Sequence, residues 1–297
     1  MEQKHIAYVY EPFAQTADYI AVNATIVRRW GEVMMRKGVQ KVERLLDIAT
    51  GVGTIAELFF KHVVRQGEEP AVICLDASVE ALEQANARRS PVVSKLELHH
   101  ALVQEMTLPE QSVDAAVWGN GIHYLSPPMQ EQALHAIKRV LKPGGWFCFS
   151  TAFYAEARPP ETHPFYMAQV KKAVMHLRSL GVTRREREAR AESSYFLPRS
   201  HYEALLAKVD FTMEHVEEFA GRLYQTAWEH ISSFSQYAAG ALHGYDPALA
   251  AEAMRLAVAP ALAEHGQRDE HGNLYVQRNW LSIMARLNPP ALPGAHV

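Results

Sequence analysis

Short apolar runs alternate with amphipathic stretches through the first half of this 297-residue chain. Between the runs, apolar residues recur every three or four positions, which is the spacing of one helical face. Near-continuous apolar strands separated by amphipathic helices are typical of a parallel sheet covered on both faces. The pattern therefore predicts an α/β fold with a Rossmann-like, doubly wound sheet. The predicted strands are residues 45–48, 71–76, 96–102, 112–120 and 146–151.

The segments outside this alternation are mainly helical. Near the N-terminus, a stripe that includes Tyr19, Ile26 and Trp30 predicts a helix that ends at Gly38. The second half contains two further strand patterns among several helical ones. These are helices over 163–192 and 226–265, the latter broken near 244–247, a helix that follows residues 196–200 and reaches Val209, and strands over 211–219 and 274–287.

We expect four regions along the chain. A helical cap is followed by the ligand-binding core, then by the rest of the sheet, and finally by a flexible tail. Two helical insertions in the third region, about 153–210 and 220–270, are long for plain connections and are expected to cover the ligand as a lid. The four regions are residues 1–40, 41–152, 153–287 and 288–297.

Composition excludes some classes of function. Thirty Lys and Arg against 33 Asp and Glu give a net charge of −3, without the basic excess that nucleic-acid binding usually requires. No uncharged run approaches membrane-spanning length, and no signal-like segment opens the chain, so we expect a cytoplasmic protein with no membrane partner. Cys74 and Cys148 lie inside apolar strands and are expected to be small buried residues. No disulfide and no metal site are predicted.

A small-residue turn connects the first predicted strand to the helix after it. Residues 45–54 read LLDIATGVGT, so an apolar strand containing Asp47 runs into Ala49, Thr50, Gly51 and Gly53. Glycine allows close approach of the backbone to a ligand and accepts left-handed dihedral angles. The helix beyond the turn directs its N-terminus at the same place. This arrangement predicts a ligand at the turn.

Other polar or small residues end the neighbouring strands. Ligands of open α/β sheets bind at the carboxyl ends of the strands. The second strand ends in Asp76, whose carboxylate is suited to accept hydrogen bonds from both hydroxyls of a ribose. The third ends near Leu102 and Val103, and the fourth ends at Gly119 and Asn120. The ligand is therefore expected to contain adenosine.

Two adenosine cofactors compete for this turn. A dinucleotide fingerprint requires G-x-G-x-x-G directly after the strand, and the third glycine is missing here. Asp47 would also place a negative charge near a pyrophosphate. S-Adenosylmethionine carries an ammonium and a sulfonium instead, and both favour a neighbouring carboxylate. The charges therefore favour S-adenosylmethionine over NAD.

Four motifs in this part of the chain are similar to those of one known family. Residues 45–53 are similar to its first motif, 76–85 to its ribose-binding segment, 106–114 to the run before its fourth strand, and 141–145 to the turn into its fifth. The chain thus resembles, over residues 40–152, the class I S-adenosylmethionine-dependent methyltransferases. Within them it looks closest to the ubiquinone/menaquinone C-methyltransferase-like, small-molecule branch.

The resemblance implies a seven-stranded sheet with an antiparallel last strand, and S-adenosylmethionine as cofactor. One departure concerns the end of the third strand, where the family often has an acid followed by a small residue. Here Leu102 is expected to flank the adenine, the Val103 backbone to bond it, and Gln104 to supply a polar contact. The cofactor-binding residues implied are Asp47, Ala49, Thr50, Gly51, Gly53, Asp76, Ala77, Leu102, Val103, Gly119 and Asn120.

The methyl acceptor should lie beyond the end of the fourth strand. His123 is the candidate general base, because imidazole titrates near neutrality; a histidine simply bonded to a neighbouring carbonyl is an equal alternative. Aromatic residues of the cap and lid are expected either to line an apolar pocket or to pack in the core. The Arg184–Arg190 run has alternating charges and is interpreted as a solvated helix face. The candidate substrate-binding residues are Tyr10, Phe13, Tyr124, Tyr195 and Trp228.

These features predict methyl transfer to a small, fairly hydrophobic metabolite at oxygen, nitrogen or carbon. One alternative is a non-methylating member of the fold, a cyclase or ligand-binding protein with a structural cofactor. Another is an NAD-dependent oxidoreductase, which Asp47 disfavours. The oligomeric state is open, with a homodimer among the alternatives.

Overall fold

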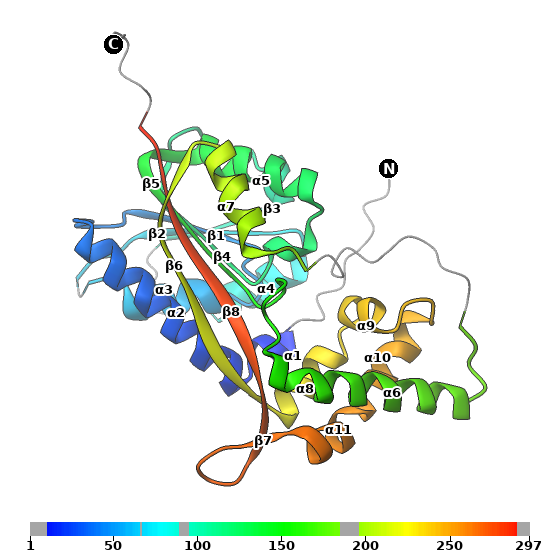
Figure 1. Ribbon diagram of the computed structural model, residues 1–297. Helices are drawn as coiled ribbons and strands as arrows, with labels where there is room; N and C mark the ends of the chain where they lie inside the picture. The colour runs from blue at the N-terminus through cyan, green and yellow to red at the C-terminus, as the bar shows by residue number, and fades with distance from the viewer. Residues whose placement is uncertain (1–10, 66, 89–94, 185–195, 290–297) are drawn as a thin grey trace.

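The computed structural model describes residues 11–65, 67–88, 95–184 and 196–289, and its centre is one mixed sheet (Figure 1). Each predicted strand is present in it, with ends shifted by a few residues. A two-residue strand, β7, was too short to be predicted. The strands are β1 (Arg44–Ile48), β2 (Ala71–Asp76), β3 (Lys95–His100), β4 (Val113–Gly119), β5 (Leu141–Thr151), β6 (Phe211–Tyr224), β7 (Gln267–Arg268) and β8 (Leu274–Leu287).

The strand order is β3-β2-β1-β4-β5-β8-β6, with β7 paired to the start of β8. The five neighbouring strands β3, β2, β1, β4 and β5 pair in parallel, whereas β8 is antiparallel to both β5 and β6. This confirms the predicted Rossmann-like sheet with an antiparallel last strand. Because the chain order reverses between β1 and β4, their carboxyl ends open a crevice in which ligands of such sheets bind.

Helices cover both faces of the sheet and separate two apolar cores. On one face lie α2 (Ala17–Arg36), α3 (Thr54–His62) and α4 (Val79–Ala87); on the other lie α5 (Pro127–Val140) and α7 (Arg199–Lys208). Ser78 is the N-cap of α4, since its Oγ accepts a hydrogen bond from the N–H of Ala81. Cys74 and Cys148 are buried and free, as expected.

A second group of helices lies beside the sheet, in the region of the predicted insertions (Figure 1). Its helix α6 packs against α10 and α11. Gln169 on α6 connects three helices of this group, because its Nε2 donates to the Ser232 hydroxyl of α8 at 2.8 Å and to the Met254 carbonyl of α10 at 3.1 Å. The group comprises α6 (His163–Ser179), α8 (Gln225–Ser232), α9 (Ser235–Ala241), α10 (Pro247–Leu256) and α11 (Val258–His265).

Some predicted boundaries were wrong. The strand β6 continues five residues past its predicted end at Phe219 to Tyr224. Residues 142–145, expected as a turn, fall within the bounds of β5 but have no partner on β4, because the register shifts between Leu141 and Trp146 and Gly144 has a φ of 76°. Most of the Arg184–Arg190 run lies outside the described residues.

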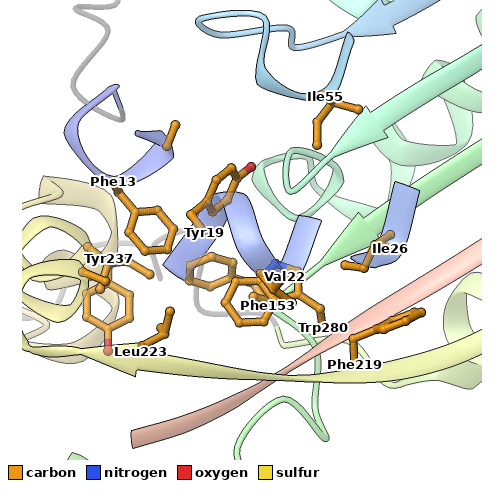
Figure 2. Packing of buried hydrophobic residues seen from close by; sticks show 14 of the residues in the cluster. Phe13, Tyr19, Val22, Ile26, Ile55, Phe153, Phe219, Leu223, Tyr237 and Trp280 are labelled. Carbon is orange, nitrogen blue, oxygen red and sulfur yellow. The ribbon is translucent and has the colours of Figure 1, made fainter. Parts of the chain in front are cut away.

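Aromatic and aliphatic side chains join the helical group to the first helices. α1 (Glu11–Ala14) carries Phe13, whose ring meets that of Tyr19 at 5.1 Å. Figure 2 shows Phe13 near Tyr237 of α9 and Leu223 of β6, with Phe153 closer to α2. The N-terminal helices and the helical insertions therefore share one core.

None of the helices in the described part of the chain combines the length and apolar character needed to cross a bilayer.

Trp30 provides a test of how α2 is fastened to the sheet. The side chain is fully buried, and its Nε1 donates a hydrogen bond to the Ser282 hydroxyl of β8 at 2.8 Å. We expect Trp30→Ala to lower the free energy of unfolding by about 3–5 kcal/mol, measured by urea denaturation, because it leaves a large cavity. Met35→Ala on the same helix, where the side chain is 56% exposed, is the control and should change it by less than about 0.5 kcal/mol. Equal effects of the two substitutions would contradict this account of the packing.

Candidate functional site

The turn after β1 is built from left-handed residues. Ala49, Gly51 and Gly53 have φ angles of 49°, 54° and 81°. The Thr50 N–H donates to the Leu75 carbonyl at 3.1 Å, so the turn is attached to the end of β2. A left-handed alanine is strained, and such strain is found preferentially at functional sites.

Asp47 lies beneath this turn. Its side chain is 1% exposed, and Oδ2 accepts hydrogen bonds from the Thr50 hydroxyl at 2.6 Å and the Ala56 N–H at 3.3 Å. Oδ1 has no partner among the described residues. Burial raises the pKa of Asp47 to about 7 from its usual 3.8, although both hydrogen bonds act to lower it. A cation at Oδ1 would lower that pKa again and restore the charge.

Asp76 ends β2 and fixes the turn from the other side. Its Oδ2 accepts from the Gly51 N–H and its Oδ1 from the Ser78 N–H, both at 2.9 Å. Each oxygen retains a further lone pair that can accept a hydroxyl proton. Burial raises the pKa of Asp76, and the backbone N–H donors oppose this rise.

The end of β4 requires residues without bulk. A Cβ on Gly119 would lie 2.3 Å from Ile55 Cγ1, and one on Gly121 would lie 2.2 Å from Trp118 Nε1. Between them Asn120 takes a φ of 51°, and its Oδ1 accepts from the Ala152 N–H at 2.8 Å. This side chain is therefore directed toward the chain that leaves β5.

These strand ends surround one cavity of about 620 Å³. Its size is within the range of small-molecule sites. Nine of the eleven predicted cofactor residues line it; Asp47 and Gly53 do not, but each is hydrogen-bonded to Thr50, which does. Their contact with a cofactor remains a prediction. The nine are Ala49, Thr50, Gly51, Asp76, Ala77, Leu102, Val103, Gly119 and Asn120.

The polar groups at the cavity fit S-adenosylmethionine. Asp47 Oδ1, a buried acceptor without a partner in the described residues, is suited to an ammonium group. The Asp76 carboxylate is suited to ribose hydroxyls. Gln104 Oε1 is likewise buried and unpaired within the described chain, and the residue lines the cavity beside Leu102, where an adenine amino group is expected.

The predicted base, His123, lies behind the cavity wall. It is on the short helix η2 (Ile122–Tyr124), and its Nδ1 is 3.2 Å from the Thr151 hydroxyl. Its ring stacks on Phe153 at 4.1 Å and contacts the ring of Tyr124, which does line the cavity. Burial, assisted by the positive charge of Arg278, lowers the pKa of His123 well below its usual value. Its role as a base remains a prediction.

The other predicted substrate residues are placed differently. Phe13 is 2% exposed and packs on Tyr19 rather than facing the cavity. Trp228 is fully buried against Phe165 and Tyr166 in the helical group. Tyr10 and Tyr195 lie outside the described residues.

The sequence did not single out every residue that forms or supports the cavity, although Phe234 belongs to the lid aromatics expected either to line a pocket or to pack. Tyr19 reaches the cavity from α2, although its helical spacing marked it only as part of a packed stripe. Phe234 is the one described residue of the two insertions that lines the cavity. Gln130 fixes the wall behind them, because its Nε2 donates to the carbonyls of Ile122 and Leu125. No local sequence signal distinguishes Tyr19 or Gln130 from ordinary core or helix residues.

No group of three or more His, Cys, Asp or Glu side chains suited to hold a metal ion occurs in the described part of the chain.

Comparison with known proteins identifies the central region. Residues 45–145 match a family model described as a methyltransferase domain. An uncharacterized methyltransferase of Schizosaccharomyces pombe is 31% identical over 121 residues, which cover 40% of this chain and 43% of the relative. A ubiquinone/menaquinone biosynthesis C-methyltransferase of Francisella tularensis subsp. novicida is 29% identical over 149 residues, 48% of this chain and 58% of the relative. The chain thus spans about half the length of these relatives.

Solved structures share the fold over a larger part of the chain. A proposed methyltransferase from Bacillus halodurans has a TM-score of 0.53 at 14% identity and covers 86% of this chain and 97% of its own. The cyclase SpnF has a TM-score of 0.50 at 16% identity and covers 88% and 85%. At such identities the likeness concerns the fold alone.

The pKa of Asp47 gives a testable dependence of stability on pH. Between pH 3.8 and about 7 the folded cofactor-free protein retains a proton on Asp47 that the unfolded chain has released. The contribution of this proton to stability is therefore complete below pH 3.8 and is lost as the pH rises toward 7. Asp47→Asn removes this dependence. We expect its free energy of unfolding to increase relative to the parent by up to about 4 kcal/mol over that interval, and to stay level at higher pH.

Urea denaturation of both proteins across this pH range, without added ligand, measures the difference. Other titrating groups cancel because they are shared by the two proteins. A difference that stays constant over the whole range would show that Asp47 titrates normally, and would contradict the geometry described.

Proposed function

We propose that this chain, whose residues 45–145 form a class I S-adenosylmethionine-dependent methyltransferase domain, methylates a small and fairly hydrophobic metabolite at oxygen, nitrogen or carbon. The observation that carries the proposal is the cavity at the β1–β4 crevice. It gathers backbone and side-chain groups that match an adenosine cofactor, next to the unpaired Oδ1 of Asp47.

The residues around the turn would hold the cofactor. In this proposal Asp47 faces the ammonium group, Asp76 binds the ribose, and Gln104 with the Val103 backbone binds the adenine edge. Bound S-adenosylmethionine supplies an activated methyl group on a sulfonium. The protein then mainly has to align the acceptor, a contribution worth about 7–11 kcal/mol in well-oriented reactions.

The acceptor side of the cavity is largely apolar. Tyr19, Tyr124, Leu125, Met129 and Phe234 line it, and they come from α2, the η2 segment, α5 and the second insertion. Such walls favour a compact, hydrophobic acceptor over a macromolecule. The net charge of −3 likewise supports a small molecule rather than a nucleic acid. We further propose that the protein acts in the cytoplasm.

His123 remains the proposed base for an acceptor that carries a proton. The role requires the tautomer in which Nδ1–H donates to Thr151, because Nε2 then has a free lone pair. Nε2 has no partner among the described residues. Burial and Arg278 depress its pKa, so the imidazole is neutral with its Nε2 lone pair available, and it is a weaker base than a free histidine. Tyr124 separates the His123 ring from the cavity. A reorientation of Tyr124 would therefore give His123 access to an acceptor bound there.

Asp76 provides the test of cofactor identity. We expect S-adenosylhomocysteine to bind the purified protein in isothermal titration calorimetry, and NAD not to bind. Asp76→Ala should weaken that binding by roughly 10- to 100-fold, because a charged hydrogen-bond acceptor is worth about 1.5–3 kcal/mol. Glu80→Ala, an exposed acid on the first turn of α4, is the matched control and should bind normally.

Methyl transfer itself is tested with isotopically labelled cofactor and a metabolite extract. The proposal predicts a labelled small molecule that disappears with Asp76→Ala. Product formation that consumes no cofactor would instead support the non-methylating alternative. Tight NAD binding without S-adenosylhomocysteine binding would support an oxidoreductase and overturn the proposal.

A further inference from the structure

A fully buried arginine, Arg278, and a partly buried one, Arg158, both contact Tyr166 beside the helical group. Arg158 follows β5, and Arg278 is on β8. Neither makes an ion pair with an acidic side chain of the described chain. A buried cation without an anion is costly, because it loses water without gaining a countercharge. Such a pair therefore needs a physical explanation.

Arg278 is held firmly by neutral groups. Its side chain is fully buried, and both Nε and Nη2 donate to the Ala152 carbonyl, at 2.8 and 2.5 Å. Nη1 donates to the Tyr166 hydroxyl at 3.1 Å, and the guanidinium lies 4.7 Å from the centre of the Phe153 ring. These contacts position the cation without neutralising it.

Arg158 is placed between two aromatic faces. Its guanidinium carbon lies 4.6 Å from the ring centres of both Tyr166 and Phe196. With both faces covered, only the edge of the guanidinium can make hydrogen bonds. Nε is buried and unpaired, and no hydrogen bond from this side chain to another described residue is present. The edge of a stacked guanidinium is the geometry that binds carboxylate or phosphate with two parallel bonds.

The pair is connected to the cavity by stacked rings. Arg278 lies over Phe153, Phe153 stacks on His123 at 4.1 Å, and His123 contacts Tyr124 at 4.1 Å. Tyr124 is part of the cavity wall. Figure 2 shows Phe153 in the core shared by the N-terminal helices and the helical insertions. An acid bound at Arg158 would thus be separated from the methyl-transfer site by an apolar, aromatic layer.

We propose that Arg158, with Arg278 behind it, binds an acidic group of the methyl acceptor, a carboxylate or a phosphate carried on an apolar body. The identification of this ligand as the acceptor rests on the proposed function; the binding of an anion by Arg158 does not. The anion completes the charge balance of the two arginines, and the stacked rings accommodate the apolar part of the molecule. Arg158 is a specificity-determining residue in this account.

The test uses the full chain and three probes that share a phenyl group. These are 3-phenylpropanoate, phenyl phosphate and the uncharged 3-phenylpropanol, titrated by calorimetry with and without saturating S-adenosylhomocysteine. We expect at least one anion to bind ten or more times more tightly than the alcohol. The stronger of the two anions identifies the acid as a carboxylate or a phosphate. Equal binding of all three probes, or no binding of either anion, would overturn the proposal.

Substitutions of Arg158 test whether this residue causes the preference for the anions. Arg158→Gln should remove at least ten-fold of the preference for the anion, and Arg158→Lys should retain part of it, while S-adenosylhomocysteine binds both as it binds the parent. Arg255→Gln is the control, since this exposed arginine pairs with Glu252 on α10. An unchanged preference in Arg158→Gln would also overturn the proposal. If Arg158→Gln fails to fold by circular dichroism, the Lys variant decides in its place.

The outcomes separate this inference from the function it extends. Normal S-adenosylhomocysteine binding with no anion preference removes the inference and leaves the proposed function intact. An anion preference that depends on Arg158, without S-adenosylhomocysteine binding, supports the anion site and removes the proposed function.

Discussion

The site depends on the burial of one carboxylate. Asp47 is a buried residue near the end of β1, an interior strand flanked by β2 and β4, and only one of its oxygens accepts hydrogen bonds, from Thr50 and Ala56. Burying an incompletely paired acid costs stability, as the pKa of about 7 indicates. A bound ligand that donates a hydrogen bond to the unpaired Oδ1 would offset this cost. The strained backbone of Ala49 and Asn120, both at the cavity, has the same implication.

The fold was largely predictable from the sequence because its information is local. The parallel strands other than β3 contain short apolar runs, β3 alternates weakly, and the helices show apolar stripes, so the period of the pattern indicates the element. The strand ends were also predictable, since Asp47, the glycine turn and Asp76 each follow directly from a buried strand. Parallel strands bring such ends to one edge of the sheet, and nine predicted residues accordingly meet at one cavity.

The acceptor side was less predictable because it is assembled from distant segments. Tyr19, Met129 and Phe234 meet only after the first helices and the second insertion pack on the core, and helical spacing does not distinguish a pocket wall from a packed face. Trp228 illustrates the difficulty, since the structure uses this aromatic residue to hold α6 and α8 together. The β7 strand was missed for a different reason, because two residues carry no periodicity.

Of the available measurements, a crystal structure with bound S-adenosylhomocysteine tests the central claim most directly. The account predicts the ligand in the β1–β4 crevice, with its amino group toward Asp47, its ribose hydroxyls on the Asp76 carboxylate, and its sulfur facing the segment from Asn120 to Tyr124. A ligand bound elsewhere, or one whose ribose does not contact Asp76 while Asp47 Oδ1 remains unpaired, would contradict it.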